Sequence, residues 1–145
     1  MSAFQRKPPA WFWIVSVVLF LWAATGVFAL YAHATLSSEG LAQMTAYDRE
    51  SYLKLPVWFV WVFALATLPA LIGAAALLMR SAIARPLYFL SLVGVVVQFG
   101  WVFGATDLIA VKGASATVPF PVAIFALGVF AWWFAGMAKV RGWLR

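Results

Sequence analysis

Four long runs of apolar residues, separated by short polar segments, dominate the chain. They cover roughly residues 11–32, 56–79, 87–110 and 119–138, and none has Lys or Arg in its interior. A helix needs about 20 apolar residues to cross the roughly 30 Å hydrocarbon core of a bilayer. The runs are continuous rather than alternating, which favours helices over membrane strands. The pattern predicts an all-α integral membrane protein, with residues 1–145 forming one antiparallel four-helix bundle.

The composition supports the same class. Of the 145 residues, 66% are hydrophobic and only 10% are charged, whereas a soluble domain is about half apolar and about a quarter charged. A soluble globular domain and a disordered chain are therefore excluded. The chain has no cysteine, which also excludes thiol catalysis and disulfides.

The basic residues predict the orientation of the bundle. Seven of the ten flank one side of the predicted spans: Arg6, Lys7, Arg80, Arg85, Lys139, Arg141 and Arg145. Lys and Arg in short loops favour the cytoplasmic side, so both termini are expected in the cytoplasm of a multi-pass protein of the bacterial inner membrane. The net charge of +6 is then a topology signal, and no nucleic-acid partner is predicted.

The first loop, residues 34–55, is the longest polar segment. Ser37 or Ser38 can cap a short helix, and Leu41, Met44 and Tyr47 follow at three-residue spacing. This spacing predicts a short amphipathic helix lying on the outer membrane face. Pro56 is expected at the first position of the second span, a position that favours proline.

Three polar residues are the candidates for chemistry. Gln98 lies near the middle of a span, where an unpaired amide costs several kcal/mol, so it is expected either to hydrogen-bond another helix or to line a cavity. Asp107 lies near the outer end of the same span and can reach water, pair with Lys112 or the first loop, or relay protons. His33 is interpreted as a polar helix end, with a pH sensor as the alternative.

Small and aromatic residues predict the helix packing. Gly100 and Gly104 form a GxxxG pair, which lets helices approach closely, and Gly94 lies one turn before Gln98. Deep in the spans, two aromatic residues and one proline are expected to shape the bundle: Trp22 and Trp101 by packing between helices, and Pro69 by bending the second helix.

No catalytic or metal-binding pattern is present in the sequence. We find no nucleophile–base–acid set, no phosphate-binding loop and no ligand cluster for a metal. The single histidine excludes a haem held by two histidines. The prediction is a non-enzymatic protein, and a bound lipid or pigment remains open.

Several segments resemble a family of small, uncharacterised bacterial inner-membrane proteins with four helices, often labelled sugar transporters. These segments are LWAATGVFALY (21–31), YLKLPVW (52–58), LLMRSAIARPLYFLSL (77–92) and VVQ (96–98). The resemblance spans about residues 22–102 and points to six positions: Trp22, Tyr52, Pro56, Trp58, Arg80 and Gln98. A fainter resemblance joins residues 48–56 to membrane-bound glutathione-using enzymes, but this chain has no asparagine and so lacks their pattern.

Two functions follow as expectations. The leading one is association with other components of the membrane, as a homo-oligomer or as an accessory subunit of a larger complex in contact with membrane lipids. The alternative, which the family label implies, is a carrier for small, sugar-like solutes. Four helices are few for one carrier, so this alternative requires an oligomer.

Overall fold

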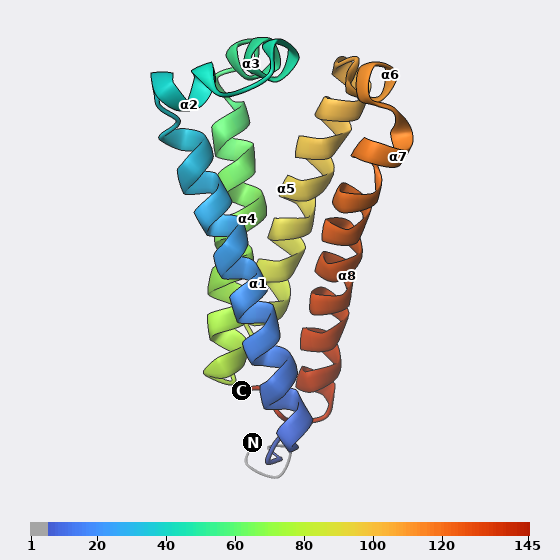
Figure 1. Cartoon of the computed structure of the whole chain (residues 1–145). Coiled ribbons are helices and arrows are strands. Elements are labelled where there is room, and N and C mark those ends of the chain that lie inside the picture. Colours follow the sequence, from blue (N-terminus) through green and yellow to red (C-terminus); the bar gives the residue numbers. More distant parts are fainter. Residues whose placement is uncertain (1–5) are drawn as a thin grey trace.

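The computed structural model describes residues 6–145 and is mainly helical. Four of its helices are long and apolar enough to cross a membrane: α1 (Ala10–Ala34), α4 (Phe59–Leu78), α5 (Ala84–Ala105) and α8 (Pro119–Val140). They run antiparallel, so both chain ends lie at one end of the bundle, here called the terminal end (Figure 1). The opposite end is called the loop end. The predicted all-α architecture of a multi-pass membrane protein is confirmed at this level.

The boundaries of the second and third spans differ from the sequence prediction. Pro56 precedes α4 and is not its first residue, because Trp58 occupies the capping position. The third span begins earlier, at Ala84, and ends earlier, at Ala105, because Thr106 adopts an extended backbone. Asp107 therefore lies outside the span, at the start of a separate short helix.

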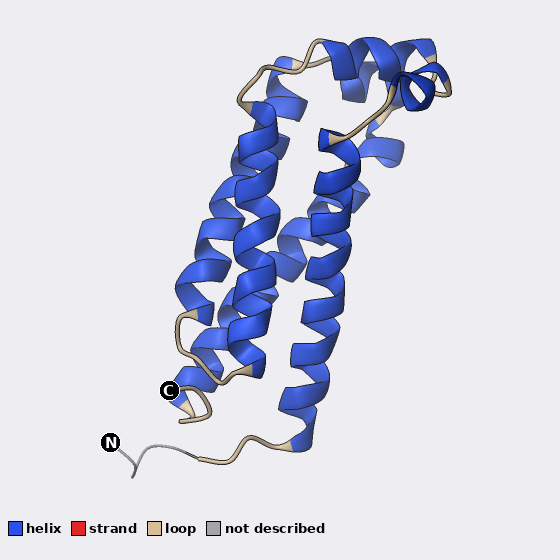
Figure 2. Cartoon of the chain, turned by 90° about the vertical axis from the view of Figure 1, so that its left-hand side faces the viewer, coloured by secondary structure: helices blue, strands red, loops and turns tan. Residues whose placement is uncertain are grey.

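Short helices cover the loop end (Figure 2). The first loop forms α2 (Ser38–Ala42) and α3 (Ala46–Leu53), where the sequence predicted one helix. The helix is interrupted between them because Thr45 caps the start of α3. Its hydroxyl accepts a hydrogen bond from the backbone N–H of Asp48. The third loop contains two more short helices, α6 (Leu108–Lys112) and α7 (Ala114–Thr117).

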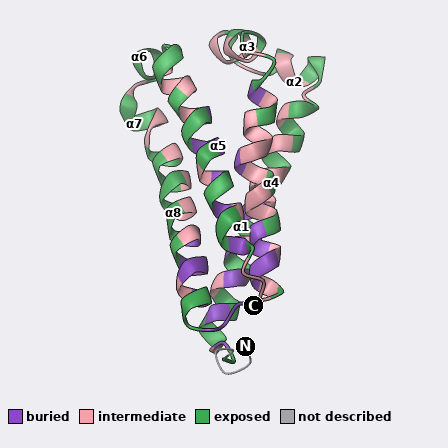
Figure 3. Cartoon of the chain, turned by 180° about the vertical axis from the view of Figure 1, so that it is seen from behind, coloured by how far each residue is buried: buried purple, intermediate pink, exposed green. Residues whose placement is uncertain are grey.

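The long helices pack in chain order, α1 on α4, α4 on α5 and α5 on α8. Buried residues gather in the half nearer the terminal end (Figure 3). There aromatic side chains of α1 meet α8 and the segment that follows it. Phe12 is stacked 5.7 Å from Phe134, and Trp11 lies edge-on at 5.3 Å from Trp143. Towards the loop end, α1 and α4 spread away from α5 and α8 (Figure 1). The bundle is thus closed at one end and splayed at the other.

Arg80 ties the short loop between α4 and α5 to both ends of the described chain. Its guanidinium donates to the carbonyl oxygens of Trp143 at 2.8 Å and Arg6 at 2.9 Å. Its own carbonyl accepts from the backbone of Arg145 at 2.8 Å. Arg80 holds this position with a φ of 56°, a conformation that is uncommon for residues other than glycine. The residue predicted as a topology signal therefore also has a structural role.

Candidate functional site

The four long helices surround a cavity of about 380 Å³. This volume falls within the range of pockets that hold small organic ligands. Aromatic side chains form much of the wall, and the polar groups are few. The aromatic residues are Trp22, Phe63, Tyr88, Phe99 and Phe120, and the other polar residues are Thr25, Thr67, Ser91 and Gln98.

Of the helix pairs around the cavity, α1 and α8 pack least closely. Three of its four sides are closed by directly packed helix pairs, α1 with α4, α4 with α5 and α5 with α8. On the fourth side, the Trp22 ring of α1 approaches the Phe120 ring of α8 edge-on, at 6.5 Å between centroids. All four helices are long and apolar enough to cross a membrane.

Gln98 lines this cavity. Its side chain is only 7% exposed, and within the described chain it makes no hydrogen bond. Of the two options that the sequence left open for Gln98, the structure places it on the cavity wall. Burying an amide without a hydrogen-bond partner is costly.

Tyr88 is a second buried polar residue of the cavity, and the sequence analysis did not single it out. It is 4% exposed, and its hydroxyl has no hydrogen-bond partner among the described residues. Ser91 lies between Tyr88 and Gln98 on the same stripe of α5 and donates to the carbonyl of Ala66 at 2.5 Å. The spacing of these three residues, at positions i, i+3 and i+10, is the signal that indicates a polar stripe on one helix face.

Gly94 lets α5 approach α4 at backbone distance. A Cβ on Gly94 would lie 2.5 Å from the backbone nitrogen of Ala66. Pro69 lies within the same helix, α4, and leaves the carbonyl of Leu65 without its helical donor. The close contact of Gly94 and the hydrogen bond of Ser91 therefore both lie at Leu65 and Ala66, where α4 lacks one backbone hydrogen bond.

Gly100 and Gly104 do not pack in the monomer. No atom lies within 4 Å of a Cβ placed on either residue, and both are exposed. Trp101, on the same helix, packs edge-on against Trp58 at 5.8 Å and lies 5.7 Å from Phe59. The GxxxG face thus points away from the other described helices, whereas Trp101 fills the space between α4 and α5.

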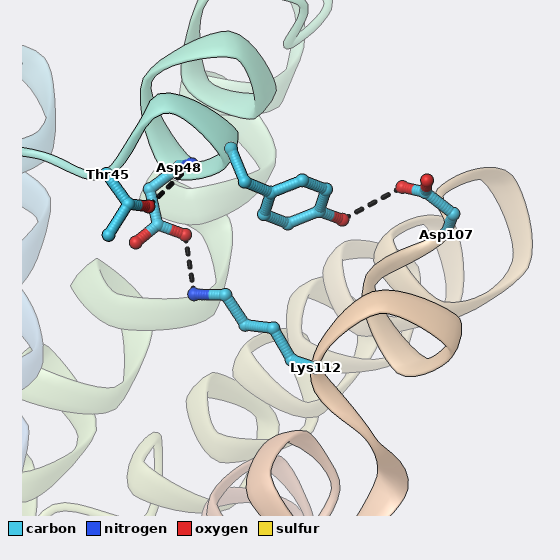
Figure 4. A network of polar contacts seen from close by, with 5 residues as sticks. Thr45, Asp48, Asp107 and Lys112 are labelled. Atoms are coloured by element: carbon cyan, nitrogen blue, oxygen red, sulfur yellow. Dashed lines mark hydrogen bonds and ion pairs between the residues drawn. The ribbon is translucent and has the colours of Figure 1, made fainter.

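A polar network joins α3 to α6 across the loop end (Figure 4). The Tyr47 hydroxyl donates to Asp107 at 2.8 Å, and Lys112 pairs with Asp48 at 2.5 Å. The hydrogen bond from Lys112 lowers the pKa of the Asp48 carboxyl. Partial desolvation and the hydrogen bond to Asp107 raise the pKa of the Tyr47 phenol. Of the predicted options, Asp107 takes a partner from the first loop and not Lys112.

His33 lies among aromatic rings where α1 meets α4. Its ring centroid is 5.1 Å from that of Tyr52, 5.7 Å from that of Phe59 and 5.2 Å from that of Phe63. The Tyr52 hydroxyl donates to the His33 backbone carbonyl at 2.7 Å. The histidine is half-buried at the end of its helix, and it does not line the cavity.

Comparisons with protein-family models, characterised proteins and solved structures found no match to this chain. The resemblance to small four-helix proteins of bacterial inner membranes therefore stays a prediction. The geometry of the cavity is the remaining basis for a functional argument.

Proposed function

We propose that this protein is a non-enzymatic inner-membrane protein that acts by association, as a homo-oligomer or an accessory subunit. The observation that carries this proposal is the apolar cavity, together with the loose packing of α1 against α8 at its wall. An apolar space that opens into the bilayer is accessible to molecules in the membrane without passage through water. The seven basic residues at or near the terminal end support cytoplasmic termini.

The exposed face of α5 supports contact with a second membrane helix. Gly100 and Gly104 lie one helical turn apart and leave the surface of α5 open. Helices in a membrane associate through close packing, which small residues permit. A partner helix at this face gives either a homo-oligomer or a heteromeric complex.

Native mass spectrometry tests this proposal on protein that is gently extracted from its own membranes. We expect a mass above that of the 15.9 kDa monomer, from a further copy, another subunit or a bound small molecule. A stable, empty monomer contradicts the proposal.

A pair of variants locates the protein contact. Gly100→Leu with Gly104→Leu is expected to remove the higher mass if a helix packs on this face. The matched control is Val93→Leu with Val97→Leu, which enlarges two other exposed side chains of α5 with the same spacing and is expected to leave assembly unchanged.

A small-solute carrier is the second candidate. It is favoured by Gln98, whose amide lines the cavity. Flux of sugars and other small polar solutes into proteoliposomes tests it, with Gln98→Leu expected to reduce the rate. Absence of flux for all of these solutes removes the carrier and leaves the association proposal standing.

A further inference from the structure

Two buried polar side chains of the cavity have no hydrogen-bond partner among residues 6–145. Gln98 is 93% buried and Tyr88 is 96% buried, and both lie on the wall. The Tyr88 hydroxyl and the Gln98 amide together offer hydrogen-bond donors and an acceptor. In the hydrocarbon region no bulk water satisfies such groups. A bound molecule with its own polar atoms supplies the missing hydrogen bonds.

The charge of the wall limits what this molecule is. No charged side chain is found among the described residues that line the cavity. A carboxylate, phosphate or ammonium group there would be desolvated without an opposite charge, which is strongly unfavourable. The molecule is therefore neutral.

The hydroxyl groups of the cavity wall also limit how polar the bound molecule is. Thr25, Thr67 and Ser91 already donate to the backbone carbonyls of Trp22, Phe63 and Ala66. Among the described side chains this leaves the Tyr88 hydroxyl, the Gln98 amide and the Trp22 indole N–H as free donors of the wall, of which the first two are buried; these are too few for the many hydroxyls of a sugar. The remaining wall is aliphatic and aromatic, which favours a mainly apolar molecule.

The positions of the two buried donors indicate the shape of the molecule. Tyr88 and Gln98 are ten residues apart on α5, which is about 15 Å at the rise of an α-helix. A compact head group reaches one of them, and an elongated molecule lying along α5 reaches both. Such a molecule enters from the bilayer past the Trp22–Phe120 contact.

We infer that the cavity binds a neutral, elongated, lipid-like molecule, whose carbonyl or hydroxyl oxygens hydrogen-bond to Tyr88 and Gln98. This inference rests on the proposed function, because it names the chemistry of one molecule with which the protein associates.

A competition experiment tests the inference. The full chain is placed in phosphatidylcholine nanodiscs and labelled with a photoreactive aliphatic diazirine alcohol, and the labelled residues are mapped by mass spectrometry. We expect labels on the cavity wall, displaced by lauryl alcohol and methyl decyl ketone but not by laurate or maltose. Dodecane is expected to compete more weakly than the ketone, by roughly two- to tenfold for each lost hydrogen bond.

Variants that remove single polar groups identify the anchor residues. Because each competitor carries one oxygen and the two side chains are about 15 Å apart along α5, the variant that removes the anchor of that oxygen, Tyr88→Phe or Gln98→Leu, is expected to weaken displacement by the ketone and the alcohol by roughly two- to tenfold. Both variants are expected to leave dodecane unchanged. The matched controls are Tyr31→Phe, at a side chain that is 65% exposed, and Gln43→Leu in the first loop. Both controls are expected to bind like the wild type.

Several results overturn the inference. Equal competition by dodecane and the ketone shows that only an alkyl chain is recognised, displacement by laurate shows a charged ligand, and displacement by maltose favours the sugar carrier. Labels outside the cavity also contradict it. If the probe fails while native mass spectrometry finds a bound subunit, the ligand class is wrong and the association proposal survives.

Discussion

Gly94→Ala tests the closest contact in the bundle. The added methyl carbon would lie 2.5 Å from the backbone nitrogen of Ala66, 2.7 Å from the carbonyl carbon of Leu65 and 2.8 Å from the Cα of Ala66. These are backbone atoms of α4, so no side-chain rotation relieves the contact and the two helices must separate. Separation also weakens the hydrogen bond from Ser91 to the carbonyl of Ala66.

The expected loss of stability follows from three effects. Overpacking costs about 1–3 kcal/mol, and the weakened hydrogen bond costs up to about 1 kcal/mol. The higher helix propensity of alanine offsets up to about 1 kcal/mol of this loss. We therefore expect Gly94→Ala to lower the free energy of unfolding by about 2 kcal/mol.

Gly100→Ala is the matched control on the same helix. A Cβ at Gly100 meets no atom within 4 Å, so this variant keeps the propensity gain without the clash. Both variants are compared by equilibrium unfolding of the monomer in mixed micelles as the fraction of denaturing detergent is raised. If Gly94→Ala is as stable as Gly100→Ala, α4 and α5 do not touch at backbone distance and the reasoning is refuted.

Two further predictions concern the ends of the bundle. Arg80→Ala removes two hydrogen bonds to backbone carbonyls and is expected to lower the free energy of unfolding by about 2 kcal/mol. The control is Arg85→Ala, which loses a cation–π contact with Trp132. Equal melting temperatures of the two variants would contradict the structural role of Arg80. At the loop end, Lys112 lowers the pKa of Asp48 below its usual 3.8. The ion pair therefore contributes its full stability above pH 3.8, and this contribution is lost as the pH falls through the lower pKa that Asp48 has in the folded state. Lys112→Met is expected to lower the free energy of unfolding by less than about 1 kcal/mol at neutral pH and to have no effect once Asp48 is protonated. A thermal-unfolding difference that persists in the protonated state would show that the ion pair is not its cause.

The membrane spans were predictable because their length and hydropathy are set by the bilayer, whatever the tertiary packing. Helix ends were less predictable, because hydropathy does not register a backbone break. The apolar residues after Asp107 extended the predicted third span to 110, yet Thr106 is extended and α6 starts a new helix. Pro56 suited a first helical position, but Trp58 is the residue that caps α4.

The site was partly predictable for a similar reason. Gln98 is the one amide near the centre of a span, so its cost in hydrocarbon alone makes it a candidate. Tyr88 lies near a helix end, where tyrosine commonly anchors a helix at the membrane interface. Its burial depends on helix packing that hydropathy does not encode. The GxxxG pair is likewise visible in the sequence, but the side of the bundle that it faces is not. Spans that are apolar all round do not indicate which helix face is buried.

Different residues of α5 pack against α4 and line the cavity. Gly94 fixes α5 to α4 through backbone contact, while the stripe from Tyr88 to Gln98 borders the cavity. The aromatic contacts at the terminal end and the α3–α6 network at the loop end hold the bundle at both extremities. Away from the terminal end, α1 and α8 meet through the edge-on contact between Trp22 and Phe120. The inferred route of the ligand from the bilayer therefore passes the contact between these two rings.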